Sequence, residues 1–255
     1  MSSGVETVIN STYKKPTYDF WWFPVSSGGG DKNLFNNGGP LQKYDSVFGT
    51  NSRAYEMQRN SANPYNPQTR WLGHCDKASL CVCLLAPPRK SVNFRGVVFT
   101  VRDIQGLLVK VVHSLSYHYD YIGKRFPEGS VQEPSPHEVY NGLKQWGHRL
   151  LPLIADVSPA QEVWNYPFDM VQFDFNNQVM HMSSSGFAKE NRSIRFDWAR
   201  NSWLGSNVDF WWQPIADSDL ASRESWPVEQ KQMVTPFLNP HVSPRNVYDI
   251  YILSI

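Results

Sequence analysis

The sequence has 255 residues, of which 41% are hydrophobic and 14% aromatic, with 24 basic and 23 acidic residues. Because these charges nearly cancel and form no long run of one sign, we expect no nucleic-acid partner. The first ten residues hold neither a basic nor an apolar segment, and no apolar stretch approaches the roughly 20 residues that span a bilayer, so we expect a soluble chain without a signal peptide or a membrane span. The length is compatible with one domain, and we expect residues 1–255 to form a single domain.

Residues 1–70 are rich in Gly, Asn and Ser, a composition that favours turns and irregular backbone over periodic elements. The run FWWF at residues 20–23 is too apolar to be left in water without a partner. We therefore expect this segment to wrap around the main core and to be anchored there by its aromatic side chains.

The next segment predicts a helix that begins at a cysteine. Apolar residues recur at helical spacing from Cys75 to Ala86, and two prolines follow at once. The amides and the dipole at a helix N-terminus favour thiolate, the nucleophilic form, and the same amides can hold an oxyanion. Cys75 is therefore the candidate nucleophile, and a small buried cysteine without reactivity is the alternative.

The other two cysteines, Cys81 and Cys83, fall inside this helix. Three cysteines cannot all pair, and Cys81 and Cys83 are too close for an easy disulfide. Their spacing lacks the second ligand pair of a zinc site. We expect reduced thiols, no metal and no cofactor, with any calcium requirement left open.

Beyond this helix the sequence predicts a hairpin, two helices and several strands. Alternation over residues 91–101 indicates a hairpin, and Asp103 suits the N-cap of the helix that follows. The segment SPHE at residues 135–138 has the cap, proline and acidic first turn that begin a helix, which runs through Trp146. Strands are expected at residues 150–157, 162–176, 192–198, 208–212 and 247–255.

A succession of short motifs runs from residue 71 to residue 108. WLGHC at 71–75 is followed by VNFRGVVF at 92–99 and VRDI at 101–104. This succession resembles the nucleophile region of the elicitor-type transglutaminases, whose pattern is Trp-x-Gly-x-Cys, an apolar helix, a hairpin and Val-x-Asp-Ile/Leu. Other segments that resemble family blocks are WWFP at 21–24, KYD at 43–45, YIGKR at 121–125, ADV at 155–157, EVWNYP at 162–167 and VDFWWQP at 208–214. The resemblance covers most of residues 18–214, with residues 71–214 as the core and residues 215–255 as a tail that has no match.

The resemblance implies an α+β fold with a papain- or transglutaminase-like core, in which the helix that bears Cys75 packs on an antiparallel sheet. It also implies that Cys75 is the nucleophile and that Asp156 is the carboxylate that orients a basic histidine. Taken alone, Asp156 would be interpreted as a strand-end cap or a salt-bridge partner.

The position of the basic histidine departs from the family. The family pattern Asn-Pro-x-x-Phe-His appears here as SPHEVY at residues 135–140, so that Tyr140 stands where the base is expected. A phenol with a pKa near 10 is a poor base at neutral pH. His137, one helical turn earlier, is the first candidate to replace it and His148 the second, while a surface or capping histidine is the alternative for both.

The residues that we expect to line the site are Trp71, His74, Asp103, Tyr140, His148 and Trp164. The side chain of His74 is expected to point away from the neighbouring thiol, and helix capping is the alternative role for both His74 and Asp103. Asp76 opposes thiolate formation at Cys75 by like-charge repulsion, and Lys77 partly offsets this effect.

Two functions follow from these patterns. In the first, Cys75 attacks a glutamine carboxamide or a peptide carbonyl, His137 transfers the proton and Asp156 orients the imidazole, after which lysine or water resolves the thioester. In the second, the base has been lost at Tyr140 and the fold persists as a scaffold that binds protein partners. We expect Cys75, Asp156 and either His137 or Tyr140 to converge at one cleft. If Tyr140 is the third group, we expect it to donate a hydrogen bond to Asp156.

Overall fold

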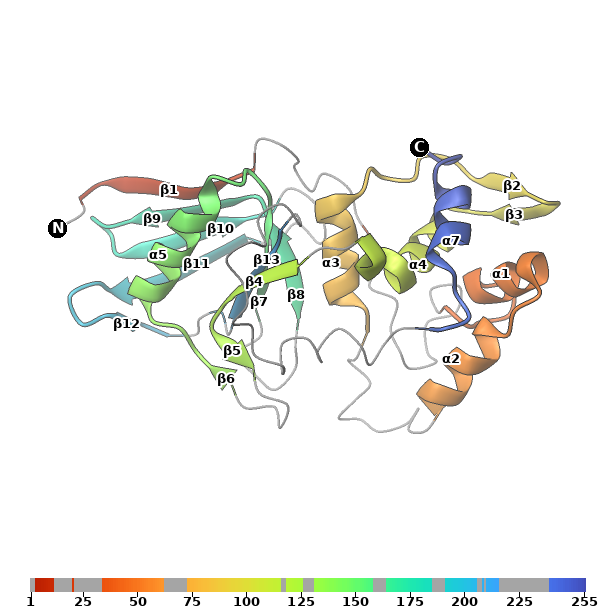
Figure 1. Ribbon diagram of the computed structural model, residues 1–255. Coiled ribbons are helices and arrows are strands. Elements are labelled where there is room, and N and C mark those ends of the chain that lie inside the picture. The colour runs from red at the N-terminus through yellow and green to blue at the C-terminus, as the bar shows by residue number, and fades with distance from the viewer. Residues whose placement is uncertain are drawn as a thin grey trace. The chain divides into compact units, whose positions relative to one another are not determined.

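The computed structural model describes residues 3–11, 20, 34–61, 73–115, 118–125, 131–157, 164–184, 191–205, 208, 210–215 and 239–255. Two compact units make up the chain. Unit 1 comprises Met1–Asp19, Val82–Leu84 and Tyr117–Ser222, and unit 2 comprises Phe20–Cys81, Leu85–Ser116 and Arg223–Ile255. Figure 1 labels their helices and strands.

Unit 1 contains two antiparallel sheets. The first has the order β1-β9-β10-β11-β12, with β1 Val5–Asn10, β9 Met170–Asp174, β10 Val179–Ser183, β11 Asn191–Asp197 and β12 Ser202–Trp203. The second has the order β4-β13-β7-β8, with β4 His118–Ile122, β13 Phe210–Ile215, β7 Leu153–Asp156 and β8 Asn165–Phe168. A short ribbon pairs β5 (Lys124–Arg125) with β6 (Val131–Gln132).

The core of unit 1 is formed by the buried side chains of helix α5 (Pro136–Gly147) and by buried strand residues. Buried residues occupy every second position of β9 and β10, as expected for strands that face a core on one side. All four residues of β7 are buried. Helix α5 passes close to β1 at Gly147, where a Cβ atom would lie 2.4 Å from the carbonyl oxygen of Val8. A glycine is therefore required by the packing of the helix on the strand.

Unit 2 is mostly helical. Its elements are α1 (Pro40–Phe48), α2 (Ser52–Ser61), α3 (Cys75–Leu84, of which Val82–Leu84 belong to unit 1), the hairpin of β2 (Val92–Phe94) and β3 (Val97–Phe99), α4 (Val101–Val111) with a 3₁₀ turn at Val112–Leu115, and α7 (Pro244–Tyr251). Helix α4 is the centre of this unit, because its residues from Asp103 to Val111 are all buried and it contacts both α1 and α7. None of the described helices of the chain is long and apolar enough to cross a membrane.

Several predicted elements are confirmed. The hairpin at residues 92–99, the helix that begins at Cys75, the helix capped by Ser135 and the strand that ends at Asp156 are all present. Helices combined with antiparallel sheets confirm the α+β class. The single-domain organisation stays a prediction. Of the expected FWWF anchor, Phe20 is described and buried, and residues 21–23 lie outside the described residues.

Three predictions are wrong. Residues 1–70 contain β1, α1 and α2 in addition to irregular backbone. The N-cap of α4 is Thr100, and Asp103 occupies the third helical position. The predicted terminal strand at residues 247–255 is instead helix α7 with its following turn, because Val247, Ile250 and Tyr251 are buried at the spacing of a helical face, not at the alternation of a strand.

Candidate functional site

Cys75 is the first residue of helix α3 and is buried. The amide of Ala78 donates the first intrahelical hydrogen bond, 2.7 Å long, to the carbonyl of His74. The positive end of the helix dipole therefore lies at Cys75, where it favours a thiolate. Cys81 and Cys83, deeper in the same helix, are buried and not in disulfide bonds, as expected for structural cysteines.

The carboxylate of Asp76, which follows Cys75 in the chain, is paired with the ammonium of Lys77. The ammonium of Lys77 lies 2.6 Å from a carboxylate oxygen of Asp76, and the Lys77 side chain is almost completely buried. Since this ion pair carries no net charge, Asp76 opposes ionisation of the thiol less than an isolated carboxylate would.

A buried polar cluster lies beside the start of α3 within unit 2. One oxygen of Glu56, on α2, accepts a hydrogen bond from Lys110 of α4 at 2.8 Å, and the other accepts one from the amide of Asn239 at 2.9 Å. The Nε2 atom of His74 lies 4.0 Å from the same carboxylate. We name these four residues the Glu56 cluster. His74 is the N-cap residue of α3, and its side chain makes no capping hydrogen bond.

Sequence reasoning missed Glu56, Lys110 and Asn239. The available signal was Lys110 itself, which stands among apolar residues in the segment LLVKVV at 107–112. A lysine in the middle of a buried helix requires a buried acidic partner. The sequence could have indicated that such a partner exists, but three separate segments had to be brought together before it could be identified.

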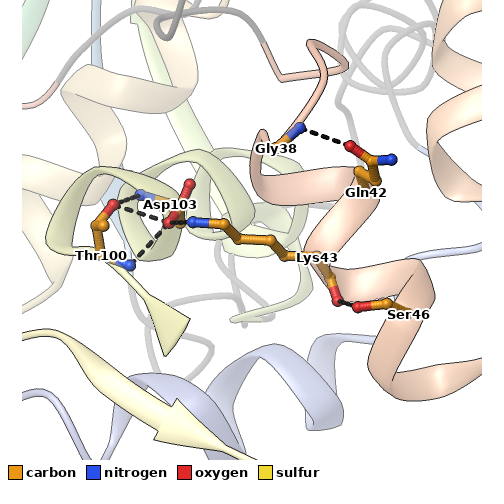
Figure 2. A network of polar contacts seen from close by, with 6 residues as sticks. All are labelled: Gly38, Gln42, Lys43, Ser46, Thr100 and Asp103. Atoms are coloured by element: carbon orange, nitrogen blue, oxygen red, sulfur yellow. Dashed lines mark hydrogen bonds and ion pairs between the residues drawn. The ribbon is translucent and has the colours of Figure 1, made fainter. Parts of the chain in front are cut away.

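Asp103 has a structural role in unit 2 (Figure 2). Its carboxylate accepts hydrogen bonds from the backbone amide of Thr100 at 2.7 Å and from the Thr100 hydroxyl at 2.8 Å, which completes a capping box at the start of α4. The ammonium of Lys43, from α1, lies 2.6 Å from the same oxygen. Asp103 therefore takes part in capping α4 as the partner of Thr100, which is close to its alternative role, and it also joins α1 to α4.

The KYD segment at residues 43–45 makes three different connections within unit 2. Lys43 binds Asp103, as described above. The hydroxyl of Tyr44 accepts hydrogen bonds from the Ser243 amide and the Asn246 side chain, next to and on α7. Asp45 accepts hydrogen bonds from the first amides of α2. This motif of the family resemblance thus ties α1 to three other helices.

Asp156 is fully buried at the end of β7 in unit 1. Its Oδ1 atom accepts a hydrogen bond of 2.8 Å from the backbone amide of Trp164, and the Val157 amide donates to the carbonyl of Trp164 at 3.1 Å. Asp156 therefore holds the strand end to the segment that enters β8. Opposite Asp156, across the strand pair, stands Asn165, whose side chain accepts a hydrogen bond from the indole of Trp212 at 2.9 Å.

His137 lies in the first turn of α5, also in unit 1. Its Nε2 atom is 2.9 Å from the carbonyl oxygen of Trp198, and its ring lies 4.1 Å from that of Trp198. Since a carbonyl can only accept, Nε2 carries the proton, and in the neutral ring Nδ1 is the basic nitrogen. The backbone amide of His137 also donates to the Asn201 side chain at 2.9 Å.

Tyr140 packs within an aromatic group of unit 1, with edge contacts to Phe173, Phe175 and Trp198. Its hydroxyl donates to a carboxylate oxygen of Glu6 at 2.5 Å. Because a phenol has one proton to donate, this bond takes the place of the hydrogen bond to Asp156 that was expected if Tyr140 were the third group of the site.

Lys144 completes the environment of this phenol. Its ammonium contacts the Tyr140 hydroxyl at 3.2 Å and lies 2.8 Å from Glu6. Hydrogen bonds from Lys144 and then from Tyr140 hold the pKa of Glu6 below its ordinary value, and the hydrogen bond to Glu6 raises the pKa of Lys144.

His148 follows the last residue of α5 and is exposed. Its Nδ1 atom donates a hydrogen bond to the carbonyl of Gln145 in the final helical turn. This contact is the capping role that was the alternative interpretation for His148.

The predicted site residues divide between the two units. Unit 2 holds His74, Cys75 and Asp103, and unit 1 holds His137, Tyr140, His148, Asp156 and Trp164. Within unit 1, the structure joins Asp156 and Trp164 directly. Trp71 lies outside the described residues, and the convergence of Cys75 with the unit 1 residues stays a prediction. No group of three potential metal-ligating side chains occurs among the described residues.

Comparison with known proteins identifies a solved structure with a similar fold. No protein-family model matches the sequence, and a search of curated proteins gave no match. The structure is similar to the crystal structure of the GP42 transglutaminase from Phytophthora sojae, with a TM-score of 0.61 over 98% of this chain and 91% of that chain, at 13% sequence identity. The chain therefore has a transglutaminase-like fold.

Proposed function

We propose that this protein is a transglutaminase-like acyltransferase with Cys75 as its nucleophile. The observation that carries the proposal is the place of Cys75, at the first position of a ten-residue helix in a chain with a transglutaminase-like fold. The helix dipole favours the thiolate at this position, and the pairing of Asp76 with Lys77 reduces the repulsion from that carboxylate.

In the proposed reaction, the Cys75 thiolate attacks the carbonyl carbon of a glutamine carboxamide. The tetrahedral intermediate collapses, the C–N bond breaks and ammonia leaves with the proton that the base had taken from the thiol. A lysine amine or water then attacks the thioester and releases the thiolate. Amides of the first turn of α3 are suited to stabilise the oxyanion of both intermediates. Protein substrates are therefore the proposed partners.

We assign the base to His137 and its orientation to Asp156. The bond from Nε2 of His137 to the Trp198 carbonyl supports this role, because it leaves Nδ1 available to accept a proton. The buried Asp156 carboxylate is held at a strand end by the Trp164 amide, which suits a group that orients an imidazole. Tyr140 is a weaker candidate, since its hydroxyl is bound to Glu6.

One observation favours the second function, a scaffold without catalysis. The residue that aligns with the family base, Tyr140, is built into the aromatic core of unit 1 and into the pair of Glu6 and Lys144. If no other group replaces the missing imidazole, the fold persists as a protein-binding module.

Two measurements on the whole chain separate these functions. The first is the pH dependence of alkylation by iodoacetamide, followed by mass spectrometry of the peptide that contains Cys75. An activated Cys75 reacts well below the ordinary thiol pKa of about 8.5, whereas a structural thiol stays inert until the protein unfolds. Cys81 and Cys83, which are buried in the same helix, serve as internal controls.

The second measurement is incorporation of a fluorescent primary amine into a glutamine-rich protein. We expect incorporation by the parent chain, none by Cys75→Ser, and a loss of at least about a hundredfold for His137→Gln. His148→Gln is the matched control and should retain activity, because its ring caps a helix end. A parent chain whose Cys75 is inert and which incorporates no amine would establish the scaffold instead.

A further inference from the structure

The Glu56 cluster is costly for unit 2 to bury. Glu56, Lys110 and His74 are 3%, 4% and 1% exposed. A buried ion pair loses so much hydration that its replacement by apolar side chains of similar volume is often neutral or stabilising. Packing alone therefore gives no reason for two charged groups here, and buried charges with specific partners are typical of functional sites.

The cluster is connected directly to the residue before the nucleophile. His74 is the N-cap residue of α3, yet its side chain makes no capping hydrogen bond, and its Nε2 atom lies 4.0 Å from Glu56. Glu56 is in turn bound by Lys110 of α4 and by Asn239, which also donates to the carbonyl of Ser52 at 2.8 Å. Helices α2 and α4 thus fix the start of α3 through one carboxylate.

We propose that Glu56, Lys110 and His74 are positioning residues that set the ionisation of the Cys75 thiol. This inference rests on the proposed function only in taking Cys75 as the reactive group. Charges in a buried environment act on one another more strongly than in water, so a change of one charge in the cluster alters the balance between thiol and thiolate.

Among the described residues of unit 2, two other titratable features lie on or beside α3. Asp76 and Lys77 neutralise each other on the helix itself. Tyr251 of α7 interacts with Cys81 in the middle of the helix, donates to the Ala86 carbonyl at 2.8 Å, and has its pKa raised chiefly by burial. Tyr251 is therefore neutral in the range where a thiol titrates.

The test measures the ultraviolet absorbance of the thiolate against pH, with Cys75→Ser as the blank. Glu56→Gln removes one negative charge from the cluster, so we expect the pKa of Cys75 to fall by about one unit. Lys110→Met removes one positive charge from the cluster, and we expect a rise of about one unit. The double variant Glu56→Gln/Lys110→Met removes one charge of each sign and should return to the pKa of the parent chain.

The opposite signs distinguish this role from a structural one. If the cluster only holds α3 in place, both single variants shift the pKa in the same direction, toward that of an ordinary thiol, and the proposal is overturned. His74→Gln protects the test against misfolding, because it keeps the buried charges paired. We expect it to move the pKa of Cys75 toward that of an ordinary thiol, because it removes the side chain that links the N-cap residue of α3 to Glu56. An unchanged titration would also overturn the proposal.

Absorbance reports ionisation whether or not amine transfer occurs, so the two proposals can fail separately. Shifts of opposite sign without amine incorporation would leave this inference standing and remove the proposed activity. Amine incorporation without any shift would do the reverse.

Discussion

Replacement of Asp103 tests whether this family-like carboxylate is a structural or a catalytic group. Asp103→Ala removes the acceptor of two hydrogen bonds from Thr100, at 2.7 and 2.8 Å, and the partner of Lys43 at 2.6 Å. Loss of a helix cap costs about 1 kcal/mol, and hydrogen bonds to a charged group contribute about 1.5–3 kcal/mol. Because the carboxylate is 9% exposed, solvent replaces little of this, and we expect unit 2 to lose about 3 kcal/mol.

A loss of this size corresponds to a melting temperature about 6–12 °C lower, measured by circular dichroism. Hydrogen exchange should place the change at the start of α4, where the capping box is removed. Lys43→Met is the matched control. It removes the ion pair, keeps the capping box, and should cost at most about 1 kcal/mol, since Lys43 is partly exposed.

The reasoning fails if Asp103→Ala melts with the parent chain. It fails in a more informative way if Asp103→Asn abolishes amine incorporation while stability and the alkylation of Cys75 stay unchanged. That pattern would make Asp103 a catalytic residue, because an asparagine retains an oxygen that can accept from Thr100.

Three further outcomes are expected. Tyr140→Phe loses its hydrogen bond to Glu6 and should cost about 1 kcal/mol in chemical denaturation, with no effect on alkylation of Cys75. Glu138→Gln should destabilise the protein at pH 7 more than at pH 3. Hydrogen bonding from the Ser135 amide, and then from its hydroxyl, lowers the folded-state pKa of Glu138, so its contribution is present above the unfolded pKa and is lost as pH falls through the folded one. Gly147→Ala should lower the melting temperature, because its methyl group would meet the carbonyl oxygen of Val8.

Each of these outcomes has a contradicting result. A Tyr140→Phe variant with slower alkylation of Cys75 would place the phenol in the reactive site. Equal destabilisation by Glu138→Gln at both pH values would mean that the charge of the carboxylate is irrelevant to the cap. For Gly147→Ala, a melting temperature at or above that of the parent chain would show that α5 can move away from β1 without loss.

Local sequence signals were sufficient to predict a helix end where the capping or terminating residues are close neighbours in the sequence. Ser135, Pro136 and Glu138 predicted the start of α5, because a capping box is made by residues three positions apart. The end of the cysteine helix before the two prolines followed from the same kind of local rule. At α4 the local rule was applied to the wrong residue: both Thr100 and Asp103 can cap a helix, and the observed box uses Thr100 as the cap and Asp103 as its reciprocal partner.

Local signals failed where the sequence is polar or the pattern is short. Helices α1 and α2 were missed in a segment rich in Gly, Asn and Ser. The KYD segment holds α1 through contacts with Asp103 and Ser243, which lie far along the chain. The terminal helix α7 was taken for a strand because a nine-residue apolar segment fits both periods until its partner is known. Contact with α4 decides which of its residues are buried.

The sequence by itself determined the transglutaminase-like resemblance, the place of Cys75 at a helix start, and the replacement of an expected histidine by Tyr140. All three depend on residues that are neighbours along the chain. Only the tertiary structure decided that Tyr140 donates to Glu6, 134 positions away, and that Glu56 and Lys110 meet beside His74. A charged residue in a buried segment indicates that it has a partner of opposite charge. The identity of that partner depends on how the helices pack, because the two residues are far apart in the sequence.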